Sequence, residues 1–216
     1  MTPSRDLAEY YQARASEYDA IYAKPERQTD LRRLEQDLPQ ALANRSVVEV
    51  ACGTGYWTQF IARSAPSIVA LDLTPATLAI ARHRCRDTQM RLVQGDAFAL
   101  PFAARSFDAA FAGFWISHVE RSRVAAFLSG LNACLRDGAR VVLLDNRYVE
   151  GNSTPIVERD HEGNTFQDRR LADGSVTRVL KNFPTEAELC SLVQSYARAT
   201  AYRAYDYYWT FAYELR

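Results

Sequence analysis

Hydrophobic residues recur along the chain with two alternating periods, which predict an alternation of strands and helices. Short apolar runs predict five strands, at residues 47–51, 67–72, 90–94, 107–114 and 140–145. Stripes at helical spacing predict helices over 56–63, from Thr74-Pro75 with a capping hydroxyl, and over 124–135, where Asp137-Gly138 is expected to stop the last one. Strands that alternate with helices are typical of βαβ units and a mostly parallel sheet.

The N-terminal segment predicts two helices rather than strands. Two apolar stripes at helical spacing carry this prediction, at Tyr11, Ala15, Tyr18 and Tyr22 and at Leu31, Leu34, Leu38 and Leu42. Pro39 falls inside the second stripe, where it is expected to kink or restart the helix.

The C-terminal third also departs from the alternation. Runs at 165–171 and 175–181 predict two strands joined by an Ala-Asp-Gly hairpin signal, inside a polar insertion at 150–182. Thr185 and Glu188 predict a capping box for a last helix through about Tyr196. Residues 199–215, rich in aromatic residues, predict a closing pair of strands.

These elements predict an α/β fold with a Rossmann-like, mostly parallel seven-stranded sheet and helices on both faces. We expect one domain over residues 1–216. Its parts are a helical lead-in or lid (1–45), a ligand-binding core (46–149), a β-hairpin insertion after strand 5 (150–182), and a closing helix and strands (183–216).

The bulk composition narrows the class of protein. Of 216 residues, 48% are hydrophobic and 24% charged, which is ordinary for one globular domain. Lys plus Arg and Asp plus Glu number 26 each, so no net field favours nucleic acid, and no such partner is expected. The four cysteines form no Cys-x-x-Cys pair, so no metal site is expected. A polar N-terminus and the lack of a run near the ~20 apolar residues of a membrane span predict a cytoplasmic protein.

A glycine turn connects the first predicted strand to the next helix. It reads E-V-A-C-G-T-G over 49–55, and it lies beyond the carboxyl end of a strand, where open parallel sheets bind ligands. A dinucleotide fingerprint would place a third glycine where Thr58 stands, and the bulky Tyr56 and Trp57 would hinder a pyrophosphate. A cofactor without phosphates therefore fits better than NAD.

Acids end the next two predicted strands. Asp72 is placed to accept hydrogen bonds from both ribose hydroxyls, or simply to cap the following helix. Asp96 is placed to meet an adenine amino group, and Phe98 or Leu73 to stack on the ring. Together with the glycine turn, these acids narrow the predicted ligand to S-adenosylmethionine.

The same blocks resemble a known family, the class I methyltransferases of the ubiquinone/menaquinone-biosynthesis type. The matching residues are V-V-E-V-A-C-G-T-G-Y-W-T (47–58), A-L-D-L-T-P (70–75), Q-G-D-A-F-A-L-P-F (94–102), F-D-A-A-F-A-G-F (107–114), L-R-D-G-A-R-V-V-L-L-D (135–145) and Y-Y-x-x-R-A-x-x-Y-D (10–19). The insertion at 150–182 matches no pattern of that family.

The resemblance implies S-adenosylmethionine as cofactor and a role for each matching position. The implied cofactor-binding residues are Tyr11, Arg14, Tyr18, Glu49, Gly53, Gly55, Trp57, Asp72, Leu73, Asp96, Ala97, Phe98 and Phe114. Among them, Gly53 and Gly55 would face the methionine and ribose portions, Phe114 would line the sulfonium, and Tyr11, Arg14 or Tyr18 would close over the methionine carboxylate.

The acceptor is expected just past the fourth and fifth strands. Candidate acceptor-binding residues are Tyr10, Trp115, Asn146, Arg147 and Tyr148. His118 is the candidate general base, because imidazole titrates near neutral pH, and its alternative is a packing histidine. Arg147 would attract an anionic acceptor or pair with Asp145 or Glu150.

The expected function is transfer of a methyl group to N, O or C of a small, possibly aromatic acceptor, by in-line displacement. Two alternatives stay open at this point: an NAD-linked oxidoreductase, and a non-catalytic nucleoside-binding module on the same scaffold. The sequence leaves the acceptor, the need for a base, the role of the insertion, and the choice between monomer and homodimer open.

Overall fold

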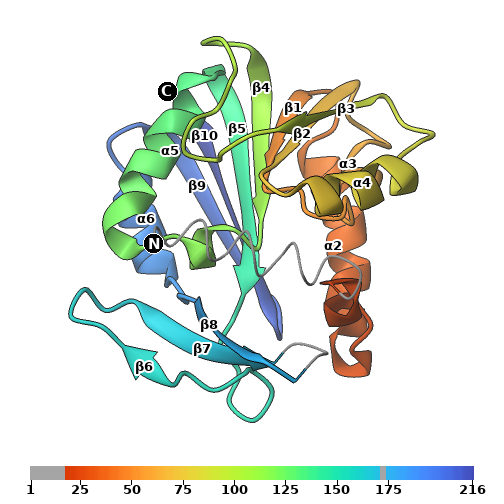
Figure 1. The fold of residues 1–216 in the computed structure, drawn as a ribbon. Coiled ribbons are helices and arrows are strands. Elements are labelled where there is room, and N and C mark those ends of the chain that lie inside the picture. The colour runs from red at the N-terminus through yellow and green to blue at the C-terminus, as the bar shows by residue number, and fades with distance from the viewer. Residues whose placement is uncertain (1–17, 171–173) are drawn as a thin grey trace.

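We describe residues 18–170 and 174–216 of a computed structural model of the chain. A seven-stranded sheet with the strand order β3-β2-β1-β4-β5-β10-β9 runs through its middle (Figure 1). Its strands are β1 (Ser46–Val50), β2 (Ser67–Asp72), β3 (Met90–Gln94), β4 (Phe107–Gly113), β5 (Leu135–Asn146), β9 (Ala197–Ala204) and β10 (Tyr208–Leu215). The first five are parallel, and β10 is antiparallel to both of its neighbours, which confirms the Rossmann-like prediction.

Helices cover both faces of this sheet. They are η1 (Tyr18–Tyr22), η2 (Pro25–Arg27), α2 (Gln28–Ala41), α3 (Thr58–Ile61), α4 (Pro75–Arg84), η3 (Ile116–His118), η4 (Arg121–Arg123), α5 (Val124–Ala133) and α6 (Glu186–Val193). In Figure 1, α5 and α6 lie on one side of the sheet and α2, α3 and α4 on the other. The result is a three-layer α/β/α arrangement.

The alternation of side chains along each strand supplies both hydrophobic cores. Val47 packs with the leucine stripe of α2, while Val48, its neighbour in sequence, packs with Phe127 and Leu131 of α5. The strands in the middle of the sheet are buried on both sides, which explains why their sequences are almost continuously apolar.

A second, antiparallel sheet is formed by β6 (Glu158–Arg159), β7 (Thr165–Arg170) and β8 (Val176–Leu180). It confirms the predicted hairpin, and in Figure 1 it lies below the carboxyl ends of the parallel strands. Buried bonds join it to the core, since Lys181 Nζ donates to Asp145 Oδ1 (2.8 Å) and Asn182 Nδ2 donates to the Val119 carbonyl (3.0 Å). The insertion therefore lies next to the carboxyl ends of the parallel strands, where the ligand site is predicted.

Two local predictions were wrong. The helix α5 ends at Ala133, because Leu135 already pairs with Phe107 of β4, and Gly138 lies inside β5. The Thr74 side chain does not cap α4. Of the two alternatives for Pro39, a restart is excluded, because the second helix of the lead-in continues through it to Ala41, and a kink stays a prediction.

Other boundaries shift without changing the architecture. The helix expected over 56–63 is reduced to the four residues of α3, and Tyr18–Tyr22 forms a 3-10 helix. The capping box of Thr185 and Glu188 forms as predicted. Within the part of the chain that the structure describes, no helix is both long and apolar enough to span a membrane.

Candidate active site

The glycine turn between β1 and α3 adopts left-handed backbone conformations at three positions, Ala51 (φ 56°), Gly53 (φ 55°) and Gly55 (φ 74°). A Cβ on Gly55 would lie 3.0 Å from the Ala81 Cβ and 3.3 Å from the Cys85 Sγ. The absent side chain of Gly55 therefore lets α4 approach the turn, rather than only exposing the turn to a ligand.

Asp72, at the end of β2, holds this turn in place. Its carboxylate accepts hydrogen bonds from the Gly53 amide (2.8 Å), the Thr74 amide (2.9 Å) and the Thr77 hydroxyl (3.0 Å). The side chain of Asp72, and not that of Thr74, therefore binds the start of α4, which is the capping role expected of Asp72. Leu73 follows with an exposed fraction of 40%, unusual for a leucine next to a core strand.

Glu49 is buried in β1, directly before the turn. Burial raises the pKa of its carboxyl to about 8, with the charge of Asp72 adding to the effect and the Thr58 hydroxyl opposing it. Its Oε2 has no hydrogen-bond donor within the described ranges. A buried carboxyl oxygen without a donor is costly, and a cationic or N–H-bearing ligand would satisfy it.

The end of β3 carries the third acid. Asp96 is exposed, and its Oδ1 accepts a hydrogen bond from the Phe98 amide (2.9 Å), while Ala97 is buried. The Arg123 guanidinium lies 3.9 Å from the centre of the Phe98 ring, and Trp115 packs edge-on against the same ring. The acid and the aromatic ring thus stand together at the edge of the sheet.

The lead-in is tied to the glycine turn by a polar cluster. The Thr54 hydroxyl donates to Asp19 Oδ1 (2.7 Å), and Arg84 Nη1 donates to the Thr54 carbonyl (2.7 Å) while its Nη2 pairs with Asp19. Next to it, the ring of Tyr22 stacks on Tyr56 with centroids 3.6 Å apart.

Several predicted residues are displaced from, or lie outside, this arrangement. Trp57 is buried in the aromatic cluster of Tyr22 and Phe114, below the turn, so its ring contributes to packing. Tyr10, Tyr11, Arg14 and the side chain of Tyr18 fall outside the described residues. Their proposed contacts stay predictions.

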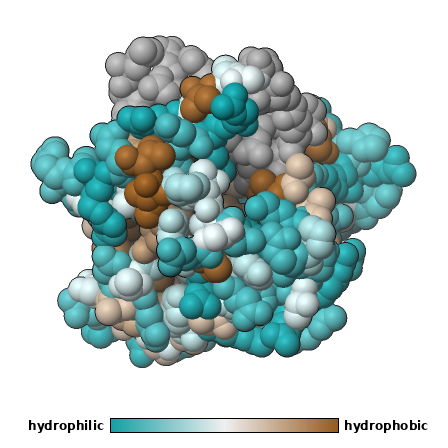
Figure 2. Space-filling view, turned by 90° about the horizontal axis from the view of Figure 1, so that it is seen from below, coloured by the Kyte–Doolittle hydropathy of each residue, from teal (hydrophilic) through white to brown (hydrophobic). Residues whose placement is uncertain are grey.

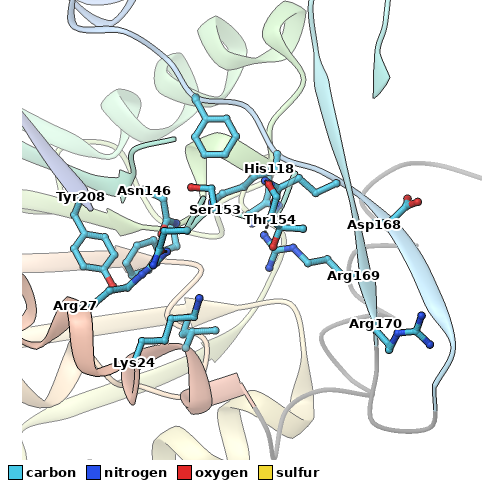
Figure 3. Close-up of a pocket in the computed structure, with 16 residues that line it drawn as sticks. Lys24, Arg27, His118, Asn146, Ser153, Thr154, Asp168, Arg169, Arg170 and Tyr208 are labelled. Atoms are coloured by element: carbon cyan, nitrogen blue, oxygen red, sulfur yellow. Dashed lines mark hydrogen bonds between the residues drawn. The ribbon is translucent and has the colours of Figure 1, made fainter. Parts of the chain in front are cut away.

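A cavity of about 300 Å³ opens where β4 and β5 end (Figure 3). Phe114, in the left-handed region at φ 57°, forms part of its wall with His118 and Asn146. The opposite walls come from three other segments: Ile21, Lys24 and Arg27 of the lead-in, Asn152, Ser153 and Thr154 of the following loop, and β7 with the start of the chain after β8. A strained backbone at a cavity wall is a common feature of binding sites.

His118 lies in this wall, as the sequence predicted for a residue near the acceptor. Its Nδ1 donates to the Leu180 carbonyl at 2.7 Å, which fixes the orientation of the imidazole. Burial and the nearby cations Lys181 and Arg169 lower its pKa to about 3, while Asp145 opposes the shift. The imidazole is therefore neutral at pH 7 in the free protein.

The predicted acceptor residues divide into those inside and those outside the cavity. Asn146 lies inside, and its Oδ1 accepts a hydrogen bond from Arg27 Nη1 (3.2 Å). Arg147 is directed elsewhere, because its Nη1 donates to the Tyr205 carbonyl (2.5 Å), and it forms no ion pair with an acid of the described residues. Tyr148 packs edge-on against Phe183, outside the wall, and Trp115 packs on the α5 side of the sheet, against Phe98 and Phe127.

Sequence reasoning missed most polar groups of the cavity. These are Lys24, Arg27, Gln167, Arg169 and Lys181. Their positions depend on how the lead-in and the insertion fold back onto the sheet, which no local pattern encodes. The alternation along the predicted strand 165–171 was the one available signal, since it puts Gln167 and Arg169 on the same face.

Comparison with known proteins agrees with the cofactor site that the geometry indicates. The family model described as a methyltransferase domain matches residues 47–138. The demethylmenaquinone methyltransferase of Tropheryma whipplei (strain Twist) is 36% identical over 106 residues, which are 48% of this chain and 42% of that protein. The chain thus matches less than half the length of that curated relative.

Two comparisons extend over more of the chain. The 2-phytyl-1,4-naphtoquinone methyltransferase of Thermosynechococcus vestitus is 27% identical over 73% of this chain and 72% of its own. The solved structure named "DhpI-SAH complex structure" superposes with a TM-score of 0.80, at 27% identity, over 98% of this chain and 96% of that one. Residues 47–138 of this chain thus match a methyltransferase domain, and the chain is similar in fold to solved S-adenosylmethionine-dependent methyltransferases.

These similarities confirm the predicted fold class and the predicted cofactor, S-adenosylmethionine. The site fits this cofactor, because Glu49 presents an unsatisfied buried oxygen and Leu73 an exposed apolar side chain next to the turn. A second structure, named "DhpI-SAM-HEP complex", superposes with a TM-score of 0.79 at 27% identity, over 97% of this chain and 96% of that one. Neither comparison favours the oxidoreductase alternative.

Proposed function

We propose that this protein is an S-adenosylmethionine-dependent methyltransferase that modifies a small molecule held in the cavity beside Phe114. The observation that supports it most is the continuity of two sites. The glycine turn, Asp72 and Asp96 mark a nucleoside site along the ends of β1 to β3, and the cavity begins at the ends of β4 and β5. Cofactor and acceptor would meet at Phe114.

Different residues of the chain bind different parts of the cofactor. Asp72 accepts hydrogen bonds from the ribose, Asp96 and Ala97 hold the adenine, Phe98 and Leu73 cover its faces, and Glu49 serves the amino end. S-adenosylmethionine, when bound, supplies an electrophilic methyl group. Phe114 offers a ring to its positive charge, an interaction of about 0.5–2 kcal/mol.

His118 has a conditional role in the reaction. A general base works best with a pKa near the operating pH, and the buried imidazole of the free protein is far below that. His118 is therefore proposed to orient the acceptor as a neutral group. It becomes a base only where the acceptor brings negative charge that raises its pKa.

The insertion at 150–182 is proposed to serve as the acceptor-binding wall of a single domain, with 1–45 as its lid. β7 brings Gln167 and Arg169 to the cavity, and Lys181 follows directly after β8. Seen from below in Figure 2, the visible surface is mostly hydrophilic, with scattered hydrophobic residues. The polar cavity wall that Gln167, Arg169 and Lys181 form favours a compact polar acceptor over the quinones for which two relatives are named.

A calorimetric titration with S-adenosylhomocysteine tests the cofactor assignment. We expect one site per chain, and Asp72→Asn is expected to weaken binding by about tenfold, since a charge-assisted hydrogen bond contributes about 1.5–3 kcal/mol. Asp87→Asn, an exposed acid after α4, is the matched control. Absence of binding at high micromolar ligand would overturn the proposal.

Turnover is tested separately from cofactor binding. Incubation with S-adenosylmethionine and a panel of small hydroxy, amino and carbon acceptors is followed by mass spectrometry for an added methyl group. A methylated product supports a methyltransferase, and the position of the methyl group identifies N, O or C as the nucleophile. Binding without turnover over the whole panel would favour a non-catalytic nucleoside-binding module.

A further inference from the structure

We propose that the cavity binds an acceptor through a negatively charged group of the phosphate or carboxylate kind, held between Arg27 and Arg169. This inference rests on the proposed function, because it names the acceptor class of the same site. It is carried by the positions of the cations around the cavity, by what they contact, and by the lack of a carboxylate partner for Arg27 and Arg169 within the described residues.

Arg27 is a buried cation of the wall, with an exposed fraction of 9%. Its Nη1 and Nη2 donate to the amide oxygens of Asn146 (3.2 Å) and Asn152 (2.6 Å), and its Nε has no partner in the described part of the chain. Neutral oxygens orient the guanidinium without neutralising it. A buried, oriented and uncompensated guanidinium is suited to an anion.

Acids close to Arg27 in sequence are directed elsewhere. Glu26 Oε1 accepts a hydrogen bond from Asn152 Nδ2 (2.8 Å), and Asp30 Oδ2 accepts one from the Tyr207 amide (2.8 Å). Neither forms an ion pair with Arg27. The rings of Tyr207 and Tyr208 lie 5.3 Å and 5.6 Å from its guanidinium carbon, which further fixes the plane of the group.

Arg169 approaches from the insertion. Its Nη2 donates to Gln167 Oε1 (2.8 Å), while its Nε is buried and has no partner over residues 18–170 and 174–216. In Figure 3 its guanidinium points toward Thr154 and His118. The half-buried Lys24 adds a third cation that forms no ion pair with a described residue.

The two described acids at and beside the cavity already have cationic partners. Asp168, which lines the cavity, pairs with Arg178 (3.0 Å), and Asp145 pairs with Lys181 (2.8 Å). The exposed Arg170 also lines the cavity and adds a further positive charge. The charge left facing the cavity is therefore positive, which is unfavourable until an anion enters.

The size of the cavity limits the acceptor. The cavity volume of about 300 Å³ is at the lower end of the range for ligand pockets. Such a cavity holds a molecule of at most roughly twenty non-hydrogen atoms. The anionic group would lie between the two arginines, and the nucleophile would face Phe114, next to the proposed cofactor site. Such a molecule is short and carries its charge at the end opposite to the methylated atom.

The anion site is tested with inorganic phosphate on the full chain. Phosphorus NMR linewidths are followed during titration at constant ionic strength, with saturating S-adenosylhomocysteine present. We expect saturable binding, weakened about tenfold in Arg169→Gln, because one charge-assisted bond is lost. Arg159→Gln, at an exposed arginine of β6 outside the cavity lining, is expected to leave it unchanged, and Lys24→Gln gives a second measurement if Arg169→Gln folds poorly.

The outcomes separate the two levels of the proposal. If S-adenosylhomocysteine does not bind, the proposed function fails. If it binds, but phosphate does not bind, or Arg169→Gln and Arg159→Gln weaken phosphate binding equally, the anion site alone is overturned. Displacement of phosphate by acetate at similar concentration assigns a carboxylate, and resistance to acetate assigns a phosphate group.

A matched pair of acceptors provides the catalytic test. A hydroxybenzoate and the corresponding hydroxybenzamide differ in charge but hardly in shape. We expect methylation of the charged member with the lower KM, and loss of that difference in Arg169→Gln. Equal KM values for both members, or efficient methylation of an uncharged naphthoquinol that is insensitive to Arg169→Gln, would contradict an anionic acceptor.

Discussion

Two buried ionisable side chains show how single residues tune this site. Glu49 and His118 lie at the ends of neighbouring strands, and burial shifts their pKa values in opposite directions, to about 8 and about 3. Both shifts favour the neutral form, because a buried charge without a strong partner is costly. Each residue therefore couples the stability of the fold to pH with its own sign.

His118 makes the protein less stable as pH falls. Its folded pKa is lowered, so between about 6.5 and 3 the unfolded chain binds more protons than the native state. The expected loss is about 2 kcal/mol between pH 7 and pH 5. Urea unfolding at both pH values measures it. His118→Gln should remove this loss, and the exposed His83→Gln should not.

Glu49 has the opposite effect in a higher pH range. Its folded pKa is raised, so its contribution to stability is complete below about pH 4.5 and is lost as pH rises through 8. We expect a loss of about 2 kcal/mol between pH 6 and pH 8 that is absent in Glu49→Gln. A variant with the same pH dependence as the wild type would show that Glu49 is ionised in the native state.

At the scale of elements, the insertion depends on one buried ion pair. Lys181, directly after β8, donates to Asp145 at the end of β5 and to the Ser117 hydroxyl (2.6 Å), with side-chain exposures of 4% and 0% for the two charged groups. This contact joins the three-stranded sheet to the central sheet and places Arg169 over the cavity.

Lys181→Met is expected to lower the free energy of unfolding by about 3–5 kcal/mol, because it leaves the Asp145 charge buried without a partner. Arg178→Met, which removes exposed ion pairs from β8, is expected to cost about 1 kcal/mol or less. Urea unfolding compares the two. The double change Lys181→Met with Asp145→Leu should be less destabilised than Lys181→Met alone, and an additive loss would contradict this account.

The sequence predicted the elements better than it predicted the cavity. Strand and helix periods, the glycine turn, Asp72 and the hairpin depend on local spacing, so they could be recognised from the chain alone. Arg27 and Lys181 lie at the cavity through bonds to Asn146 and Ser117, which are 119 and 64 residues away in sequence. The position of Arg147, whose Nη1 donates to the Tyr205 carbonyl, depends in the same way on the connection between β9 and β10.

At the scale of the whole molecule, a polar cluster connects the described part of the lead-in to the glycine turn. Asp19 connects the Thr54 hydroxyl of the glycine turn with Arg84 at the end of α4. Three segments far apart in sequence are held together there, next to the stacked rings of Tyr22 and Tyr56. The cluster therefore links the position of the lead-in to the conformation of the cofactor turn.

Asp19→Ala should release the lead-in without unfolding the sheet, since Asp19 lies outside both hydrophobic cores. Loss of two bonds to a partly exposed acid is expected to weaken S-adenosylhomocysteine binding by about threefold to tenfold. Limited trypsin digestion should cleave faster after Arg27, and the ligand should slow cleavage of the wild type more than that of the variant. Asp87→Ala, which removes an exposed pair with Arg86, is the control. If Asp19→Ala binds the ligand and resists trypsin as the wild type does, the lead-in is held by its aromatic packing alone, and the polar cluster plays no part in closing the site.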